Sequence, residues 1–327
     1  MTALLRVDDL RVSIGGDEGT AKILDHIAFK LDRGRILGIV GESGCGKSTL
    51  IRTLLGILPR TAQVEAGAIS FDGQDLLALD ERTLNRTVRG SRIGFIPQDP
   101  YLAMNPLFRV GTQMLEIMRW HAPDDGPRRT RTKRHRAHLV ELLRRVQLPD
   151  PEGALNRYPH QFSGGQRQRL LIAAALACAP ALVVADEPTT ALDVTTQQQI
   201  LDLLRELVAE RGISLLFVTH DLGVVAQLCD DLSVIYAGQT VETGATATVL
   251  NTPLHPYTRA LLACHPERSV GFAGIPGMVP PPTHAPPGCR FAPRCAHAEP
   301  ACTQRPARLV QAAPGHGVDC ILYEGVT

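Results

Sequence analysis

A glycine-rich loop near the start of the chain has residues suited to binding phosphate groups. The loop GESGCGKST follows an apolar run and precedes a stretch with helical patterning. Its spacing matches G-x-x-x-x-G-K-[S/T], in which backbone N–H groups and a helix N-terminus surround phosphate oxygens. Lys47 is expected to contact the β- and γ-phosphates of a nucleotide, and the Ser48 hydroxyl to bind Mg²⁺. The alternative is a glycine-rich turn without a ligand. The candidate nucleotide-binding residues here are Gly41, Glu42, Ser43, Gly44, Cys45, Gly46, Lys47, Ser48 and Thr49.

Two acidic residues, Asp186 and Glu187, follow the apolar run LVVA. This run places Asp186 at the C-terminal end of a buried strand, which is where ligands bind in open α/β sheets. Asp186 would hold Mg²⁺, directly or through water, and Glu187 would polarise an attacking water as general base. Taken alone, such a pair is more often a solvated strand end. Together with the Lys47 loop it predicts a nucleotide hydrolase.

Four further segments, in a fixed order along the chain, complete the candidate site. They are Gln98 in IPQDP, Phe162-Ser163-Gly164-Gly165-Gln166, Thr190-Ala-Leu-Asp193, and His220 in FVTHD. With the loop and the acidic pair, these segments resemble the ATP-binding-cassette ATPases. An unrelated nucleotide hydrolase is the alternative.

The resemblance gives each added segment a role. Gln98 is expected to sense Mg²⁺ and the water, and His220 to contact the γ-phosphate and stabilise transition-state charge. Asp193 would orient residues across a dimer interface. The segment from Ser163 to Gln166 opens a predicted helix, so its N–H groups suit a γ-phosphate. In the family this segment addresses the nucleotide of the opposite subunit, so the site is complete only in a head-to-tail dimer. The expected Mg²⁺ ligands are Ser48, Gln98 and Asp186, and the expected catalytic residues are Glu187 and His220.

The rest of the chain supplies elements that could position these residues. Apolar runs typical of strands buried on both faces alternate with helical patterns, which predicts a mainly parallel α/β sheet. A helical subdomain is expected as an insertion at about residues 99–180. The resemblance implies a P-loop NTPase cassette over residues 1–265, with an N-terminal antiparallel β region, and a Cys/Pro-rich extension over 266–327. The expected strands are 35–41, 92–98, 181–188, 214–220 and 232–238, and residues 195–211 are expected to form a helix.

Composition excludes several classes of protein. The chain has 327 residues, of which 44% are hydrophobic and 20% charged, so it is neither disordered nor fibrous. Its net charge of +1 disfavours a basic nucleic-acid binder. No signal peptide opens the chain, and Pro180 interrupts the longest apolar stretch, residues 170–185, which is too short to cross a bilayer. We therefore expect a protein that is soluble by itself.

Longer segments resemble one subfamily, the ATPases of oligopeptide and dipeptide importers. These segments are QDPYLAMNPLFRVGTQ, YPHQFSGGQRQR, ADEPTTALDVTTQQQILDLL, HPYTRALL and the tail GCRFAPRCAHAEPAC. The resemblance implies ATP hydrolysis coupled to peptide uptake at the cytoplasmic face of the inner membrane. Implied partners are two membrane permease subunits, a second similar ATPase or a second copy, and, indirectly, an extracytoplasmic solute-binding protein. Nickel, glutathione or other solutes are alternative cargoes. A soluble cassette ATPase acting on nucleic acid or ribosomes is the alternative function.

The tail contains four clustered cysteines in a proline-rich setting that buries little apolar area, so it needs a partner surface or a staple. Four thiolates serve either Zn²⁺ or an iron–sulfur cluster. The wide spacing and the subfamily resemblance favour a [4Fe–4S] cluster, with zinc or four unligated thiols as alternatives. Disulfides are not expected in a chain without an export signal. The candidate ligands are Cys289, Cys295, Cys302 and Cys320.

One feature departs from the family pattern. The family usually stacks adenine on an aromatic residue in the first β region, but residues 12–26 contain no Phe, Tyr or Trp. We expect Ile14 or a neighbour to pack on the base instead, at a cost of about 1 kcal/mol in stacking.

Overall fold

The computed structural model describes residues 3–16, 19–122, 127–190, 192–264, 274–304 and 308–324. The chain divides into two compact units, one formed by Met1–Ala78 with Val218–Thr327 and the other by Leu79–Phe217. The domain boundary expected between residues 265 and 266 lies outside the described residues. Among the described helices, none is both long enough and apolar enough to span a bilayer.

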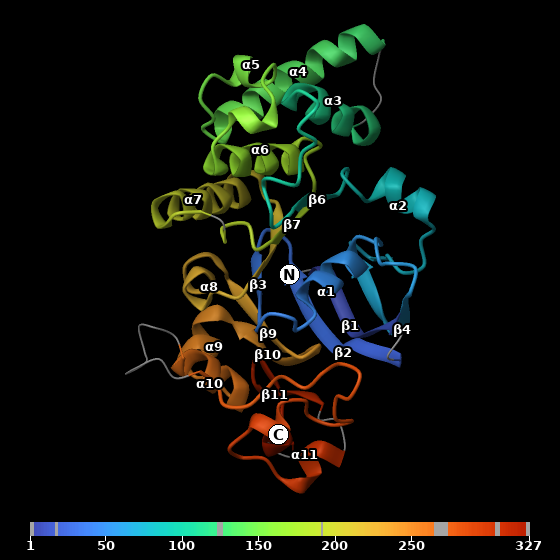
Figure 1. Ribbon diagram of the computed structural model, residues 1–327, viewed down its shortest axis with the longest axis vertical. Coiled ribbons are helices and arrows are strands. Elements are labelled where there is room, and N and C mark those ends of the chain that lie inside the picture. Colours follow the sequence, from blue (N-terminus) through green and yellow to red (C-terminus); the bar gives the residue numbers. More distant parts are fainter. Residues whose placement is uncertain are drawn as a thin grey trace. The chain divides into compact units, whose positions relative to one another are not determined.

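The first unit contains an antiparallel sheet of order β2-β1-β4-β5 (Figure 1). This is the N-terminal antiparallel region that the resemblance implied. Its long first strand carries several register shifts against both neighbours, so it bends along its length. The elements up to this sheet's last strand are β1 (Ala3–Gly16), β2 (Gly19–Asp32), β3 (Ile36–Val40), α1 (Lys47–Leu54), β4 (Ala62–Phe71) and β5 (Gln74–Asp75).

The later part of the first unit adds strands on β3. β3 pairs in parallel with β9, whereas β9–β10, β10–β12 and β12–β11 are antiparallel. The sheet is therefore mixed, with antiparallel strands added to its parallel part. The reason is local: only Ala237 and Gly238, both at positive φ, separate β9 from β10, and such a turn makes a hairpin. The elements are α8 (Leu222–Leu228), β9 (Asp231–Tyr236), β10 (Gln239–Ala245), α9 (Thr246–Asn251), α10 (Pro256–Ala263), η2 (Ala292–Arg294), α11 (Pro300–Gln304), β11 (Leu309–Ala313), β12 (His316–Asp319) and η3 (Ile321–Tyr323).

The second unit carries the parallel pair β6–β7 and most of the helices. The expected strands and the helix over 195–211 are present, and α3 to α6 occupy the segment expected to be helical. The elements are α2 (Glu81–Thr87), β6 (Ile93–Ile96), α3 (Val110–His121), α4 (Arg128–Arg145), α5 (Pro151–Ala154), η1 (Pro159–Gln161), α6 (Gly164–Leu176), β7 (Leu182–Asp186) and α7 (Val194–Arg211). β8 (Ser214–Thr219) spans the point where the chain passes back to the first unit.

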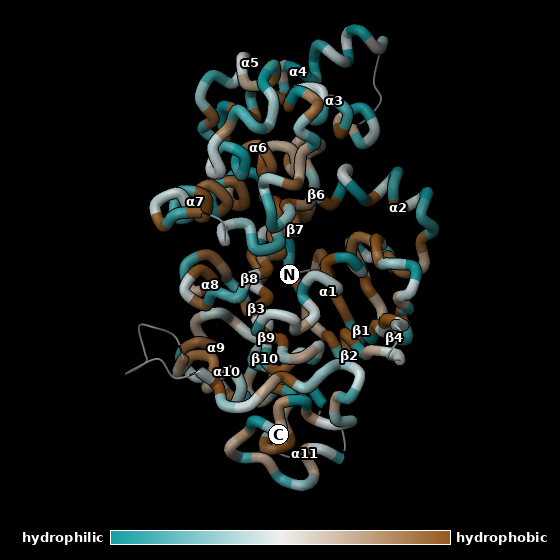
Figure 2. Tube along the Cα trace, in the orientation of Figure 1, coloured by the Kyte–Doolittle hydropathy of each residue, from teal (hydrophilic) through white to brown (hydrophobic). Residues whose placement is uncertain are grey.

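The strands that precede the candidate site residues are the most deeply buried elements. Every residue of β3, β7 and β8 is buried, and these strands are hydrophobic in Figure 2. The helices that follow β7 and β8 begin at defined residues, because side chains accept the free N–H groups of the first turn. Asp193 accepts from Thr196 at the start of α7, and Asp221 from Gly223 and Val224 at the start of α8. A buried strand followed by a capped helix fixes the position of the strand end at β7 and at β8.

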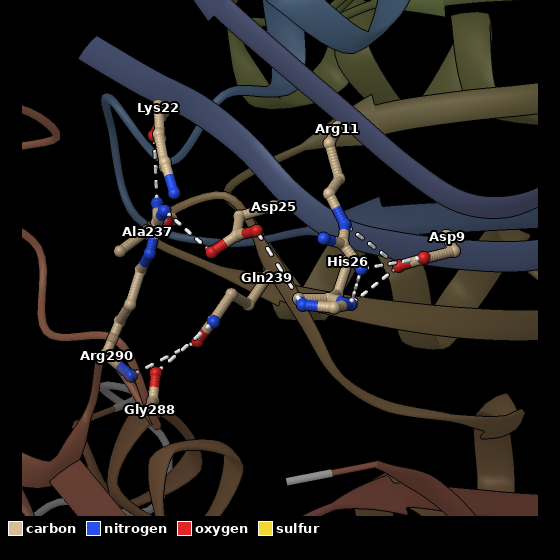
Figure 3. A network of polar contacts seen from close by, with 9 residues as sticks. All are labelled: Asp9, Arg11, Lys22, Asp25, His26, Ala237, Gln239, Gly288 and Arg290. Carbon is tan, nitrogen blue, oxygen red and sulfur yellow. Dashed lines mark hydrogen bonds and ion pairs between the residues drawn. The ribbon is translucent and has the colours of Figure 1, made fainter. Parts of the chain in front are cut away.

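The proline-rich tail is attached to the rest of its unit by strand pairing and by a buried ion pair. β12 pairs with β10, and the almost fully buried Arg290 forms an ion pair with Asp25 on β2 at 3.0 Å. Arg290 also donates to the carbonyls of Lys22 and Ala237, and Figure 3 shows this network continuing to His26. Of the two expected ways to order this segment, a partner surface or a staple, these contacts supply the partner surface: strand pairing and charged contacts to the cassette compensate for its small apolar area.

Candidate nucleotide site

The phosphate loop joins β3 to α1 in close contact with neighbouring backbone. Gly41 lies against β9, where a Cβ would stand 2.1 Å from the Ile235 carbonyl oxygen. Only glycine fits this position, so the loop's first glycine is required by packing as well as by phosphate access. The loop is also tied to the β9–β10 turn, since Gly238 N–H donates to the Cys45 carbonyl at 2.9 Å.

Lys47 begins α1 with its ammonium group directed back at the loop. Its side chain is buried, and Nζ donates to the carbonyls of Gly41 at 2.7 Å and Glu42 at 3.1 Å. An ammonium group held against the backbone of the loop is suited to bind a phosphate oxygen, because that oxygen can accept hydrogen bonds from the ammonium and from nearby backbone N–H groups. Ser48 is exposed beside it at the helix start, where its hydroxyl is accessible to a cation.

Two side chains of the loop hold the loop itself rather than face outward. The Glu42 carboxylate accepts from Arg294 at 2.8 Å, and its backbone N–H donates to the Tyr257 hydroxyl at 3.1 Å. Cys45 is buried, and burial raises the pKa of its thiol despite the nearby Lys47. Ser43 and Gly44, by contrast, are exposed. The structure therefore gives Glu42 and Cys45 supporting positions within the predicted set.

In the second unit, the acidic pair lies beside Gln98. Asp186 is buried at the end of β7, and Glu187 follows with φ 43°, a conformation that costs a non-glycine residue of order 1–3 kcal/mol. The Glu187 carboxylate accepts from Gln98 Nε2 at 3.3 Å and from Thr190 Oγ1 at 3.1 Å. Two neutral donors thus orient the Glu187 carboxylate. The structure places the predicted site residues Gln98 and Glu187 within hydrogen-bond distance of each other.

The start of α6 is a second helix N-terminus of the expected kind. Ser163 is exposed and caps the helix, accepting from Gln166 N–H while Gln166 Oε1 accepts from Ser163 N–H. Thr196 at the start of α7 packs against Gly165, with its methyl 2.7 Å from where a Cβ would stand. Asp193 caps α7 and is exposed, and the Thr196 backbone N–H lowers the pKa of its carboxyl. Ser163 to Gln166 and Asp193 therefore lie at two adjoining helix starts.

His220 follows β8 in the unit that carries the phosphate loop, and its side chain is exposed.

Three further residues had no role of their own in the sequence-based prediction: Thr190, Tyr257 and Arg294. Thr190 was within reach of sequence reasoning because it lies three residues from its partner. Tyr257 and Arg294 both contact Glu42, which lies 215 and 252 residues away from them in sequence. No local sequence pattern indicates a contact over such a distance.

The four tail cysteines line one cavity with His255 and Phe291. The eight cysteines all lie in the described residues, and no disulfide joins any of them. Two tail sulfurs accept backbone N–H groups, Cys295 from His297 at 3.4 Å and Cys302 from Glu299 at 3.3 Å. Burial raises the pKa of Cys289 to about 12 and also raises that of Cys320. Within the described residues, no group of three or more His, Cys, Asp or Glu side chains is arranged to hold a metal ion.

Comparison with known proteins agrees with this arrangement. The family model described as ABC transporter matches residues 24–190, and the one described as oligopeptide/dipeptide transporter, C-terminal region, matches residues 241–302. A probable peptide ABC transporter ATP-binding protein of Sinorhizobium fredii is 44% identical over 97% of this chain and 94% of its own length. A dipeptide transport ATP-binding protein of Escherichia coli is 41% identical over 97% of this chain and 96% of its own length.

Solved structures give the same fold. A dimeric ATP-binding cassette in a post-hydrolysis state, bound to ADP and phosphate, matches with a TM-score of 0.64 and 27% identity, covering 74% of this chain and 98% of that one. These matches confirm the transporter interpretation rather than a cassette ATPase acting on nucleic acid or ribosomes. The chain belongs to the ATP-binding-cassette transporter family, as an ATP-hydrolysing subunit whose C-terminal region is that of the oligopeptide/dipeptide transporters.

Proposed function

We propose that this subunit binds and hydrolyses ATP to drive uptake of di- or oligopeptides through a membrane complex. The observation that carries the chemistry is the Glu187 carboxylate, held by Gln98 and Thr190 at the end of a buried strand. The proposal of a peptide cargo is based on sequence similarity along nearly the whole chain to relatives named for peptide and dipeptide transport. Nickel, glutathione and other solutes remain alternative cargoes.

The residues divide the work of the reaction. Lys47 and the backbone N–H groups at the start of α1 bind the β- and γ-phosphates, and Glu187 accepts a proton from the attacking water. Ser48, Gln98 and Asp186 would hold Mg²⁺, which supplies charge neutralisation on the phosphates when bound. The oxygen ligands they offer suit this hard cation. His220 is proposed to stabilise charge on the γ-phosphate.

We also propose a head-to-tail pair of ATPase subunits, either two copies or this chain with a similar one. Ser163 and Asp193 are both exposed, and Val194 beside them is 85% exposed. An exposed helix N-terminus is suited to the γ-phosphate of a second subunit. An exposed apolar residue next to it is typical of a contact surface.

The permease subunits are proposed to dock on residues 99–125, at the cytoplasmic face of the inner membrane. This segment exposes several large apolar side chains close together in sequence, which is costly for a surface that stays in water. The exposed fractions are 53% for Tyr101, 84% for Leu102, 79% for Leu107 and 53% for Phe108. The extracytoplasmic solute-binding protein would act only through the permeases.

The test is transport by the assembled complex. With the permeases reconstituted in vesicles, ATP hydrolysis should rise when a peptide-loaded binding protein is added, and labelled dipeptide should accumulate. Leu102→Asp together with Leu107→Asp should remove the subunit from the complex, whereas Val64→Asp, at another exposed apolar residue, should not. Stimulation by nickel or glutathione but not by peptide would contradict the cargo proposal.

For the tail we propose a [4Fe–4S] cluster on Cys289, Cys295, Cys302 and Cys320. In its favour, the four thiols line one cavity and two of the sulfurs accept backbone N–H groups, as sulfurs of such clusters do. Because the thiols are not arranged for a metal as they stand, they have to draw together around the cluster and lose their protons.

Anaerobically purified protein should be brown and carry about four irons per chain. Cys302→Ser should lower the iron content, and Cys178→Ser, a control outside the tail, should not. Colourless protein with stoichiometric zinc would show that the site binds zinc instead of the cluster. Protein with neither iron nor zinc would contradict both metal assignments.

A further inference from the structure

Arg294 lies in the cysteine-rich tail yet contacts the phosphate loop. It ends the short helix η2, directly before Cys295, and its side chain is 4% exposed. Nη1 donates to Glu42 Oε2 at 2.8 Å and Nη2 to Glu42 Oε1 at 3.3 Å. This is a two-pronged arginine–carboxylate pair, which fixes direction as well as distance.

The guanidinium is itself held from other sides. It donates to the carbonyls of Ile275 and Pro276, each at 3.0 Å, and to the Tyr236 hydroxyl at 3.2 Å. A planar group with this many fixed partners has lost its rotamer freedom before it meets Glu42. The tail therefore presents a rigid cation to the loop.

A second route connects the tail with the same loop residue. Phe291, which lines the cysteine cavity, packs against Tyr257 with ring centroids 5.4 Å apart. The Tyr257 hydroxyl in turn accepts the Glu42 backbone N–H at 3.1 Å. Tail residues thus reach Glu42 through both its side chain and its backbone.

Glu42 is also in contact with the phosphate-binding lysine. Its carbonyl accepts from Lys47 Nζ at 3.1 Å. A shift of Glu42 consequently moves a group that sets the position of Lys47. We propose that Arg294 is a positioning residue of the nucleotide site, holding the phosphate loop through Glu42 so that the cysteine-rich tail and the nucleotide are energetically coupled. This rests on the proposed nucleotide binding at the loop and not on the identity of any tail metal.

A purely structural role for the pair, fastening the tail to the cassette, makes a different prediction. If the Arg294–Glu42 pair only attaches the tail, removing it should make the tail more mobile and leave nucleotide affinity unchanged. If the pair positions the loop, removing it should weaken nucleotide affinity, and the effects of substituting Arg294 and Glu42 should not add.

The experiment is a double-mutant cycle on the full chain, with the dissociation constant of ADP measured by calorimetry. Arg294→Ala and Glu42→Gln should each weaken ADP binding by about tenfold, within the range of coupling between sites. The double variant should also weaken it about tenfold rather than a hundredfold, because the second change removes a contact already lost. Arg294→Lys, which restores charge without the fork, should lie between Arg294→Ala and the wild type.

Tyr323→Phe is the matched control. Tyr323 also fastens the tail, accepting from Arg259 at 3.0 Å and donating to the Leu254 carbonyl at 3.1 Å, but it does not touch the phosphate loop. Its ADP affinity should stay within about twofold of the wild type. Unchanged affinity in Arg294→Ala, or additive effects in the double variant, would overturn the proposal. Failure of wild-type protein to bind ADP would instead overturn the proposed function.

A second measurement covers the case in which Arg294→Ala does not fold. Coupling is reciprocal, so ADP should slow amide hydrogen exchange in residues 289–302 of the wild type. In Glu42→Gln, which keeps the side chain's size and removes its charge, ADP should no longer slow exchange there. Equal exchange with and without ADP in the wild type would contradict the coupling.

Discussion

The phosphate loop and the Glu187 cluster are built in contrasting ways. The loop is made of backbone, packed against Ile235 and held by Tyr257 and Arg294 from far along the chain. The Glu187 cluster is made of side chains at a strand end, held by Gln98 and Thr190. Binding thus depends on rigid long-range support, whereas hydrolysis depends on a few oriented polar groups. Substitutions in the two regions should separate affinity from turnover.

The largest effect is expected from Glu187→Gln. The amide keeps the contact with Thr190 but cannot accept a proton from water, so turnover should fall by about 10²–10⁴-fold. ATP affinity should stay within about twofold of the wild type. The measurement is phosphate release by the assembled complex, and Glu206→Gln, an exposed change on α7, is the control. Turnover within a few-fold of the wild type would remove Glu187 from the role of base.

Lys47→Ala should act on affinity. It removes a buried cation that donates charged hydrogen bonds, each worth about 1.5–3 kcal/mol, so ATP binding should weaken by roughly ten- to a hundredfold. Calorimetry with ADP checks this, and Lys30→Ala, whose side chain is 73% exposed, serves as the control. Unchanged affinity would contradict the assignment of the loop.

A smaller effect is expected from Thr190→Val. The change removes the hydroxyl that donates to Glu187 at 3.1 Å and leaves the shape similar. Since Gln98 still orients the carboxylate, turnover should fall only severalfold, in line with one lost hydrogen bond of about 1 kcal/mol. Thr87→Val removes a comparable exposed hydroxyl contact on α2 and should leave turnover unchanged. A loss as large as that of Glu187→Gln would mean that Thr190 itself takes part in the reaction.

Much of the site could be predicted because its signals are local. The two partners of the cap, Ser163 and Gln166, are three positions apart, and the buried run before Asp186 identifies a strand end from its own sequence. What supports the phosphate loop could not be predicted in this way. In the sequence, Arg294 is a basic residue of a proline-rich tail with no distinguishing pattern. Its contact with Glu42 is evident only in the folded structure.

The fold shows the same division. The buried strands could be predicted from apolar runs, but the antiparallel strands β10, β11 and β12 were not expected. β11 has no buried residue, Val318 is the one buried apolar side chain of β12, and the pairing of these strands is set by partners elsewhere in the chain. Strand pairing over long sequence distances leaves little pattern in the strand itself.

The central claim is that the loop region sets nucleotide affinity while the Glu187 cluster sets the rate of hydrolysis. The most direct test is the ATP dependence of hydrolysis by the assembled complex for Arg294→Ala and Glu187→Gln, measured side by side. Arg294→Ala should raise KM by about tenfold with kcat within about twofold of the wild type, and Glu187→Gln should lower kcat by at least about 10²-fold with nucleotide affinity unchanged. A fall in kcat without a change in KM for Arg294→Ala, or lost ATP binding in Glu187→Gln, would contradict the account.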